Sequence, residues 1–188
     1  MKMILPRIAL SAILALAIVF AGTDEGRAQV MPPAHIAIVD FLLIQQQSLA
    51  MNDLKAQIEQ RRQVYQEQIN LQEQELRAVD QELVRQQSIL AADAFAQKRR
   101  EFEAQVAEVQ RGIQARKREL DQAFDFGVKA FEREVINIIA ELSATHGYNL
   151  VLSRQQIVFA DNQLNISQKV LELLNQRLPR VEVPAAPN

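Results

Sequence analysis

The sequence contains no cysteine and only two histidines, His35 and His146. Without thiols the chain forms no disulfide and cannot carry the lipid that bacterial lipoproteins attach to a cysteine. A transition-metal site also lacks its usual ligands, because neither histidine has a second one nearby in the sequence. One histidine precedes a predicted strand and the other lies at a predicted helix end, so both are assigned structural roles.

Sequence motifs of catalysis are missing as well. The five glycines form no phosphate-binding loop, and no nucleophile elbow of the Gly-x-Ser-x-Gly type occurs. The carboxylates of the central region alternate with arginine and lysine, which is typical of solvated helix surfaces. The sequence therefore predicts neither an enzyme nor a cofactor-binding protein.

Long apolar runs are confined to the N-terminus. Lys2 and Arg7 precede an apolar run over residues 8–21, and a short polar segment then leads to Ala28. This pattern predicts a secretory signal peptide, residues 1–28, cleaved after Ala28. The run is shorter than the ~20 residues that a spanning helix needs, although an uncleaved anchor is the alternative. We therefore expect a soluble, exported protein, a location that argues against nucleic acid as a partner.

Proline is absent and glycine is scarce between Asp53 and His146. Only Gly112 and Gly127 interrupt this stretch, which is rich in residues that favour helix. Apolar residues recur at alternating spacings of three and four, the pattern of a coiled-coil seam. The predicted seam comprises Ile58, Tyr65, Ile69, Leu76, Val79, Leu83 and Leu90, then Phe95, Phe102, Val106, Val109, Ile113 and Leu120.

The seam loses its phase between Ser88 and Ala94. Residues 53–146 as one helix would extend about 140 Å, so we place the tip of an antiparallel hairpin at residues 88–94. No glycine or proline marks a turn there, and a single rod is the alternative. Beyond Leu120 the apolar spacing shows steps of four around Gly127. Such a stutter predicts a bend, or a change of packing partner, where the hairpin meets the rest of the protein.

Glutamine replaces apolar residues at several seam positions, including Gln72 and Gln86. Thirteen glutamines lie between Gln45 and Gln87, so the two arms have little apolar surface to bury and should be held together loosely. A fully solvated coiled coil is the simplest interpretation of this pattern.

Charge is distributed unevenly along the chain. Removal of residues 1–28 takes away three basic and two acidic residues, so the net charge changes from −2 to −3. Between Val84 and Arg118, however, eight basic residues face only four acidic ones. The tip half of the hairpin is thus positive and would attract acidic chains or an anionic membrane surface. An ordinary surface of Glu and Arg pairs is the alternative.

The segments that flank the hairpin predict a small α+β base, residues 34–52 and 147–178, after a linker at 29–33. The β-branched run at 36–39 predicts a strand buried on both faces. Residues 41–50 predict a short helix, and 148–153 and 156–160 predict two strands of a β-hairpin. Asn165 or Ser167 caps a last helix that stops at Pro179. The final residues, 179–188, hold three prolines and are predicted to be disordered.

A base of three strands and two short helices buries little surface on its own. We therefore expect it to be stabilised by oligomerisation through the sheet and its flanking apolar residues. The residues expected at this interface are Ile36, Ile38, Val39, Val151, Ile157 and Phe159.

The order of these parts resembles the Skp/OmpH family of periplasmic chaperones. The resemblance covers residues 34–178 and rests on short motifs in order: Ile36-Ala37-Ile38-Val39-Asp40, Gln47-Ser48, Asn149-Leu150-Val151-Leu152, Ile157-Val158-Phe159-Ala160-Asp161 and Asn165-Ile166-Ser167. It implies a periplasmic homotrimer with a β-barrel-like body and three helical hairpins, or tentacles, around a cavity. Unfolded outer-membrane proteins would be held there without ATP. Well-known members are strongly basic, whereas this chain is slightly acidic, so lipopolysaccharide binding is not carried over.

Loosely packed, positively charged arms could hold an unfolded chain by many weak contacts acting together. We predict that clients contact the inner faces of the arms and that three basic residues steer acidic segments. The apolar contact residues are Ile89, Leu90, Phe95 and Phe102, and the steering residues are Lys98, Arg99 and Arg100. The alternative function is a structural adaptor that bridges components of the cell envelope. An adaptor should have a well-filled seam, so the glutamine-rich seam favours the holdase.

Overall fold

The computed structural model describes residues 32–184. The chain divides into two compact units, Met1–Pro33 and Ala34–Asn188. The predicted signal peptide at 1–28, with the adjoining residues up to 31, lies outside the described residues.

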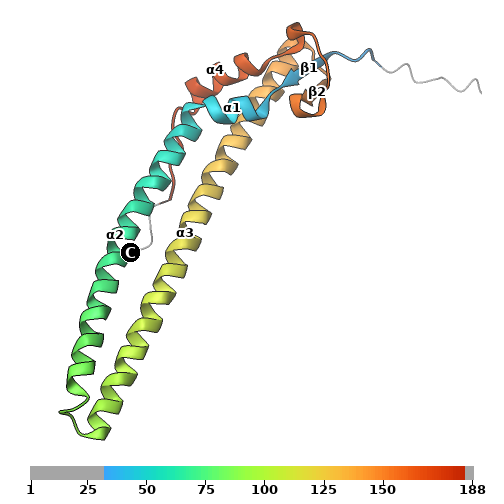
Figure 1. Cartoon of the computed structure of the whole chain (residues 1–188). Coiled ribbons are helices and arrows are strands. Elements are labelled where there is room, and N and C mark those ends of the chain that lie inside the picture. The colour runs from blue at the N-terminus through green and yellow to red at the C-terminus, as the bar shows by residue number, and fades with distance from the viewer. Residues whose placement is uncertain (1–31, 185–188) are drawn as a thin grey trace, which may run out of the picture. The chain divides into compact units, whose positions relative to one another are not determined.

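Two long antiparallel helices account for most of the second unit (Figure 1). Helix α2 spans Leu49–Gln86 and helix α3 spans Ala92–His146. The connection at residues 87–91 overlaps the predicted tip, and the helices run side by side, which rules out the single rod. The N–H of Gln87 closes α2 by donating to the carbonyl oxygen of Leu83 at 3.1 Å. Helix α3 begins without a side-chain cap, but Asp93 lies in its first turn, where a negative charge is favourable.

A break at Ser48 divides the helix that was predicted over residues 41–50. Helix α1 spans Phe41–Gln47, and Ser48 has extended backbone before α2 begins. The carboxylate of Asp40 accepts a hydrogen bond from the N–H of Leu43 at 3.0 Å, and the hydroxyl of Ser48 accepts one from Met51 at 3.3 Å. Each cap satisfies an N–H group that has no partner within its helix. The long helix therefore starts at Leu49, four residues before the predicted boundary.

The strands from the two ends of the hairpin pair directly. Strand β1 (Ile36–Val39) and strand β2 (Leu150–Ser153) form a two-stranded parallel sheet in which Ile36 faces Leu150. An isolated bridge joins Ile38 to Asn165 next to this sheet. The predicted burial of the first strand on both faces is confirmed, because Ala37, Ile38 and Val39 are all buried.

The prediction of a strand at residues 156–160 is wrong for the isolated chain. A 3₁₀ turn, η1 (Arg154–Gln156), follows β2 directly, and another, η2 (Asn162–Leu164), precedes the last helix. The residues between these turns pair with no strand of the described chain. A β-branched run becomes a strand only where neighbouring backbone groups can complete its hydrogen bonds. The prediction rested on composition, which does not supply that partner.

The core lies at the base, where α1, the N-terminal end of α2, the C-terminal end of α3, and helix α4 (Ser167–Arg177) meet. The rings of Phe41 and Phe131 pack edge to face with centroids 6.0 Å apart. The side chains that are completely buried there are Ile44, Met51, Leu54, Phe131, Val135, Ile138, Val170 and Leu174. Each such side chain contributes about 1.5–3 kcal/mol through burial.

Gly127 marks the boundary between the core and the free arms. A Cβ atom at this position would lie 2.5 Å from Cδ1 of Leu54, so α2 and α3 approach each other most easily without a side chain here. The buried residues of α3 run from Ala123 to Leu142, and those of α2 end at Leu54. The stutter at Gly127 thus lies close to the point where the buried core ends.

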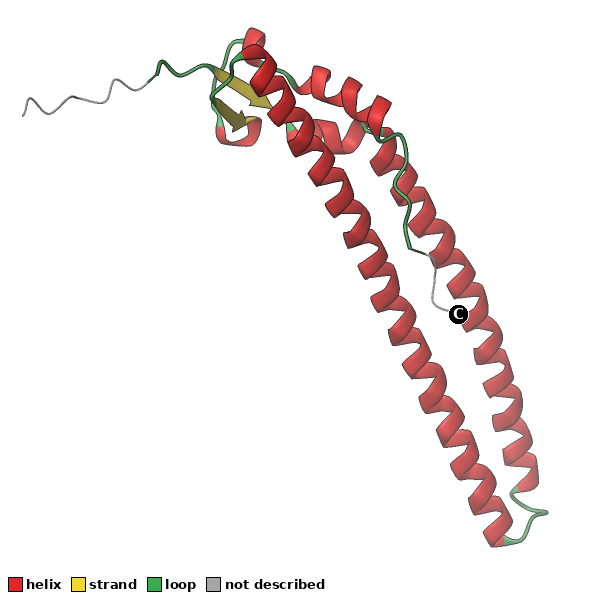
Figure 2. Ribbon diagram, turned by 180° about the vertical axis from the view of Figure 1, so that it is seen from behind, coloured by secondary structure: helices red, strands yellow, loops and turns green. Residues whose placement is uncertain are grey.

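Residues 179–184, which were predicted to be disordered, pack along α2 (Figure 2). We call this segment the tail. Val181 is buried, and its carbonyl oxygen accepts a hydrogen bond from the Gln57 side chain at 2.8 Å. Composition misled the prediction, because two valines and the carbonyl groups of this proline-containing segment find partners on the arm. Residues 185–188 lie outside the described part of the chain.

Candidate functional site

The free parts of the arms enclose no core. Between Leu54 and Ala123 no described residue of α2 or α3 is buried, and the seam side chains are only half covered. Val79 is 36% exposed although it occupies a seam position. Apolar atoms along the whole facing surface of the arms are therefore accessible from the side, as the glutamine-rich seam predicted.

The structure brings together two of the residues that were predicted to contact clients. Lys98 and Phe102 line a groove of about 450 Å³ between the arms, opposite Val79 and Leu83 of α2. Phe95 and Leu90 lie half-buried nearer the tip, whereas Ile89 is 79% exposed in the connecting segment. The predicted apolar residues thus form a discontinuous row from the tip to the groove at Phe102. Ile89, in the connecting segment, is separate from the others.

The basic residues of the tip half divide into paired and solvated groups. Arg85, Arg99 and Arg111 form ion pairs with glutamates three or four residues away, at 2.9 Å for Arg85 and 3.1 Å for Arg99. Among residues 32–184, no acidic group lies within ion-pair distance of the other five. Four of these are exposed, namely Lys98, Arg100, Lys117 and Arg118, and the fifth, Arg116, is half-buried and donates a hydrogen bond to Gln72. The surface therefore combines the Glu–Arg pairs of an ordinary helix with a set of exposed cations.

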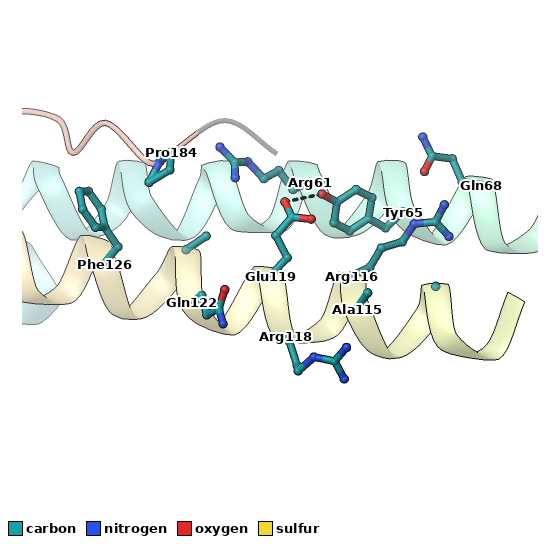
Figure 3. A pocket seen from close by; sticks show the side chains of 12 residues that line it. Arg61, Tyr65, Gln68, Ala115, Arg116, Arg118, Glu119, Gln122, Phe126 and Pro184 are labelled. Carbon is teal, nitrogen blue, oxygen red and sulfur yellow. Dashed lines mark hydrogen bonds between the residues drawn. The ribbon is translucent and has the colours of Figure 1, made fainter. Parts of the chain in front are cut away.

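A larger groove, about 830 Å³ in volume, lies between the arms closer to the base (Figure 3). Tyr65 of α2 donates a hydrogen bond to Glu119 of α3 at 2.6 Å. The guanidinium of Arg116 lies 5.7 Å from the centre of the Tyr65 ring and donates to Gln72 at 3.1 Å. Burial, followed by the hydrogen bond to Glu119, raises the pKa of Tyr65 to about 12.

Sequence reasoning treated Tyr65 only as a seam residue and did not identify Glu119. A tyrosine in a thin seam indicates a polar partner on the opposite helix, because its hydroxyl needs one when the ring is covered. Finding that partner requires the exact register of the two arms, which the irregular repeat does not define.

The base presents a second exposed surface beside its sheet. Val158 is fully exposed and Phe159 is 88% exposed in the segment that was predicted to be a strand. Of the other residues assigned to oligomerisation, Ile38 and Val39 are buried inside the base, and the rest are half-buried: Ile36, Val151 and Ile157. Of the six residues assigned to oligomerisation, only Phe159, in the segment after β2, is therefore largely exposed.

The described residues hold neither a cluster of metal ligands nor a membrane-spanning helix. Within 32–184, no group of three or more histidine and carboxylate side chains is arranged to hold a metal ion. No helix in the same range is both long and apolar enough to cross a membrane. What the surface offers is a long, accessible helical face with apolar grooves and cations, which suits binding by many weak contacts.

These features define a class of protein: a two-helix arm mounted on a small parallel sheet, with binding surfaces rather than an enclosed site. Residues 35–174 match the family described as outer membrane protein (OmpH-like). Because this match covers well over half of the sequence, the chain belongs to the OmpH-like family, as the resemblance of its motifs indicated.

A solved structure agrees with this assignment. The crystal structure of a candidate outer membrane chaperone (OmpH-like) from Caulobacter crescentus CB15 has a TM-score of 0.75 to this chain at 16% sequence identity. The likeness covers 84% of this chain and 94% of that one, and it concerns the fold. None of the curated proteins compared matches the sequence.

Proposed function

We propose that the chain is an ATP-independent periplasmic holdase, which binds unfolded outer-membrane proteins between its arms and keeps them soluble until they insert. One observation carries the proposal: the arms project beyond Leu54 and Ala123 without burying a single described residue against each other. A structural rod would use that seam for its own stability. Membership of the OmpH-like family supports the same conclusion.

The chemistry of the arms fits an unfolded, amphipathic client. Grooves such as the one at Phe102 offer apolar surface, and the exposed Lys98 beside it offers a cation whose charge also acts on Glu82 in the same groove. Many such contacts, each weak, give high overall affinity and ready release. No nucleotide is needed, because release follows when a stronger competitor, the membrane, removes segments one by one.

The same proposal includes assembly of several copies, with a trimer as the expected state. Val158 and Phe159 are exposed beside a sheet of only two strands. Pairing of the 156–160 segment with strands of another copy would cover these side chains and complete its backbone hydrogen bonds. Arms from neighbouring copies would then surround a common space in which one client can be held.

Aggregation of a client provides the test. A urea-unfolded outer-membrane porin is diluted into buffer with the exported protein, purified from the periplasmic fraction, and light scattering is followed. The holdase is expected to suppress scattering near stoichiometric amounts without ATP and to form a soluble complex of defined mass. Scattering that is unchanged, with the protein instead binding one folded envelope component, would favour the structural adaptor.

A further inference from the structure

The tail is bound to α2 in a regular way. The carbonyl oxygen of Val181 accepts from Gln57, and that of Val183 accepts from Arg61 at 3.3 Å. Four residues of helix rise about 6 Å, and two residues of extended chain advance about 6.6 Å. Gln57 and Arg61 are four residues apart, and the carbonyls that they bind are two residues apart. The helix therefore matches the repeat of an extended polypeptide.

The contacts between the tail and α2 depend on main-chain carbonyl groups and on the alternation of buried and exposed side chains. They do not depend on a particular sequence. Gln57 and Arg61 bind carbonyl groups, which every peptide has. Val181 is buried and Val183 is half-buried against the base, whereas Glu182 between them is exposed. A ligand of this kind is an extended segment with apolar residues at every second position. Transmembrane strands of outer-membrane proteins have that pattern.

The site continues past the tail. Pro184, the last described residue, lies at one end of the 830 Å³ groove, and Phe126 lies beside it (Figure 3). From there the groove follows α2 past Tyr65 to Gln68. Phe126 is 50% exposed and offers apolar surface, and the Gln68 side chain offers another amide at the groove wall. A longer extended segment in the tail's position would have room to continue toward the tip.

We propose that the Gln57–Arg61 row and the adjoining groove bind extended, alternating segments of unfolded outer-membrane proteins, and that the tail occupies this site as a tethered competitor. The inference rests on the proposed holdase function and gives it a defined contact. The tail is held by two side-chain hydrogen bonds and one exposed ion pair, Arg180 with Asp53 at 3.5 Å. A tether gives the tail a high local concentration, so a single client segment competes with it weakly and several segments that bind together displace it more readily.

Peptide binding tests the proposal. The probe is a fluorescent synthetic peptide of one transmembrane strand of an outer-membrane porin, and its control is a scrambled peptide with the apolar residues clustered. Val181→Asp should release the tail and tighten binding of the strand peptide roughly tenfold, by removing the tethered competitor. Glu182→Ala changes an exposed neighbour of Val181 and should leave the affinity unchanged. A chain that ends at Pro179 is the second variant without a docked tail, should Val181→Asp fold poorly.

The same peptide-binding measurements test the two α2 side chains that bind the carbonyl groups. In the Val181→Asp background, Gln57→Ala with Arg61→Ala should weaken the strand peptide roughly tenfold, since both carbonyl contacts are lost. An affinity that is the same with and without the docked tail would overturn the proposal. Equal tightening of the scrambled peptide would overturn it too, because alternation would then play no part.

The aggregation assay separates this inference from the proposed function. One outcome is that the wild-type protein keeps the porin soluble while the peptide affinity is the same with and without the docked tail. In that case the holdase function is supported and the tail site is wrong. If no form of the protein suppresses aggregation, the holdase itself is wrong, and the tail site falls with it.

Discussion

Tyr65 and Glu119 form a hydrogen bond of 2.6 Å across the seam between α2 and α3. It lies beyond the last buried residue of α2, in the part of the hairpin where apolar packing is thin. Arg116 lies over the same ring and reaches Gln72 on the facing helix. A polar cluster therefore supports the arms at the point where the core has ended.

Loss of this hydrogen bond should loosen the arms. Tyr65→Phe keeps the ring but leaves Glu119 without its donor, and we expect a loss of about 1 kcal/mol in the free energy of unfolding. Glu119→Gln is the matched variant, because it retains an acceptor and should cost less. Urea unfolding measures the free energy of unfolding of each variant. The rate of hydrogen exchange in α2 around residue 65 should also rise in Tyr65→Phe. Protection that is unchanged there would contradict a supporting role for the pair.

Alkaline pH should act on the same residue. The pKa of Tyr65 is raised from 10.0 to about 12, first by burial and then by Glu119. The folded chain thus holds the phenolic proton more tightly than the unfolded chain. Its contribution to stability is complete below pH 10 and is lost as the pH rises toward 12. Tyrosinate absorbance, with the Tyr65→Phe spectrum subtracted, measures the titration of Tyr65. A titration midpoint that is the same in urea as in buffer would contradict the prediction.

The two arm glycines should respond in opposite ways to alanine. Gly127→Ala places a Cβ 2.5 Å from Leu54, and such overpacking typically costs about 1–3 kcal/mol. Gly112→Ala meets no atom within 4 Å and should stabilise the helix by about 0.5–1 kcal/mol. The midpoints of urea unfolding of the two variants, each compared with that of the wild-type protein, measure these changes in stability. Adding Leu54→Ala to Gly127→Ala should relieve the clash. Leu54→Ala should therefore lower the free energy of unfolding less in the Gly127→Ala protein than in the wild-type protein.

Substitution of the exposed base residues should dissociate the assembly. Val158→Asp with Phe159→Asp places two charges where the proposed interface buries apolar side chains, and sedimentation should show a shift to monomer. Val64 and Leu71, which are 46% and 60% exposed on the arm, provide a control pair for the same substitution. If the control pair dissociates the protein and the base pair does not, the copies meet through the arms.

Neutralisation of the tip cations should slow client capture. Lys98→Gln, Arg99→Gln and Arg100→Gln together should reduce the association rate roughly threefold to tenfold at low salt. The difference should shrink as the salt concentration rises and screens the charges. A variant that removes the same charge near the base, at Lys129, Arg133 and Lys169, should have a smaller effect. Equal rates for both triple variants would show that net charge, not its position, controls capture.

Local periodicity was enough to predict some elements, but contacts between distant segments were not visible in it. The seven-residue repeat identified the arms and the region of their reversal, and β-branched residues identified the buried strand around Ile38. The break at Ser48 was missed because the apolar residues on both sides continue without a gap. The docking of Val181 was missed because its partners, on α2, lie more than a hundred residues earlier in the chain.

The site was predicted less well than the fold, for a related reason. Lys98 and Phe102 could be proposed from composition near the tip, and the structure places them in one groove. Tyr65 with Glu119, and Gln57 with the tail, depend on which residue of one segment faces which residue of another. A seam in which Gln72 and Gln86 replace apolar residues leaves that register undefined.

The parallel pairing of β1 with β2 also has a consequence for the time order of biogenesis. Ile36 can pair with Leu150 only after the chain between these two strands has been synthesised, because Leu150 lies 114 positions later in the sequence. The helices can form locally and early, whereas the sheet depends on a contact of high sequence separation, which forms slowly. A newly made chain must therefore pass through an interval in which the backbone groups of β1 have no partner strand, and during that interval the chaperone exposes the kind of unpaired strand that it is proposed to hold in its clients.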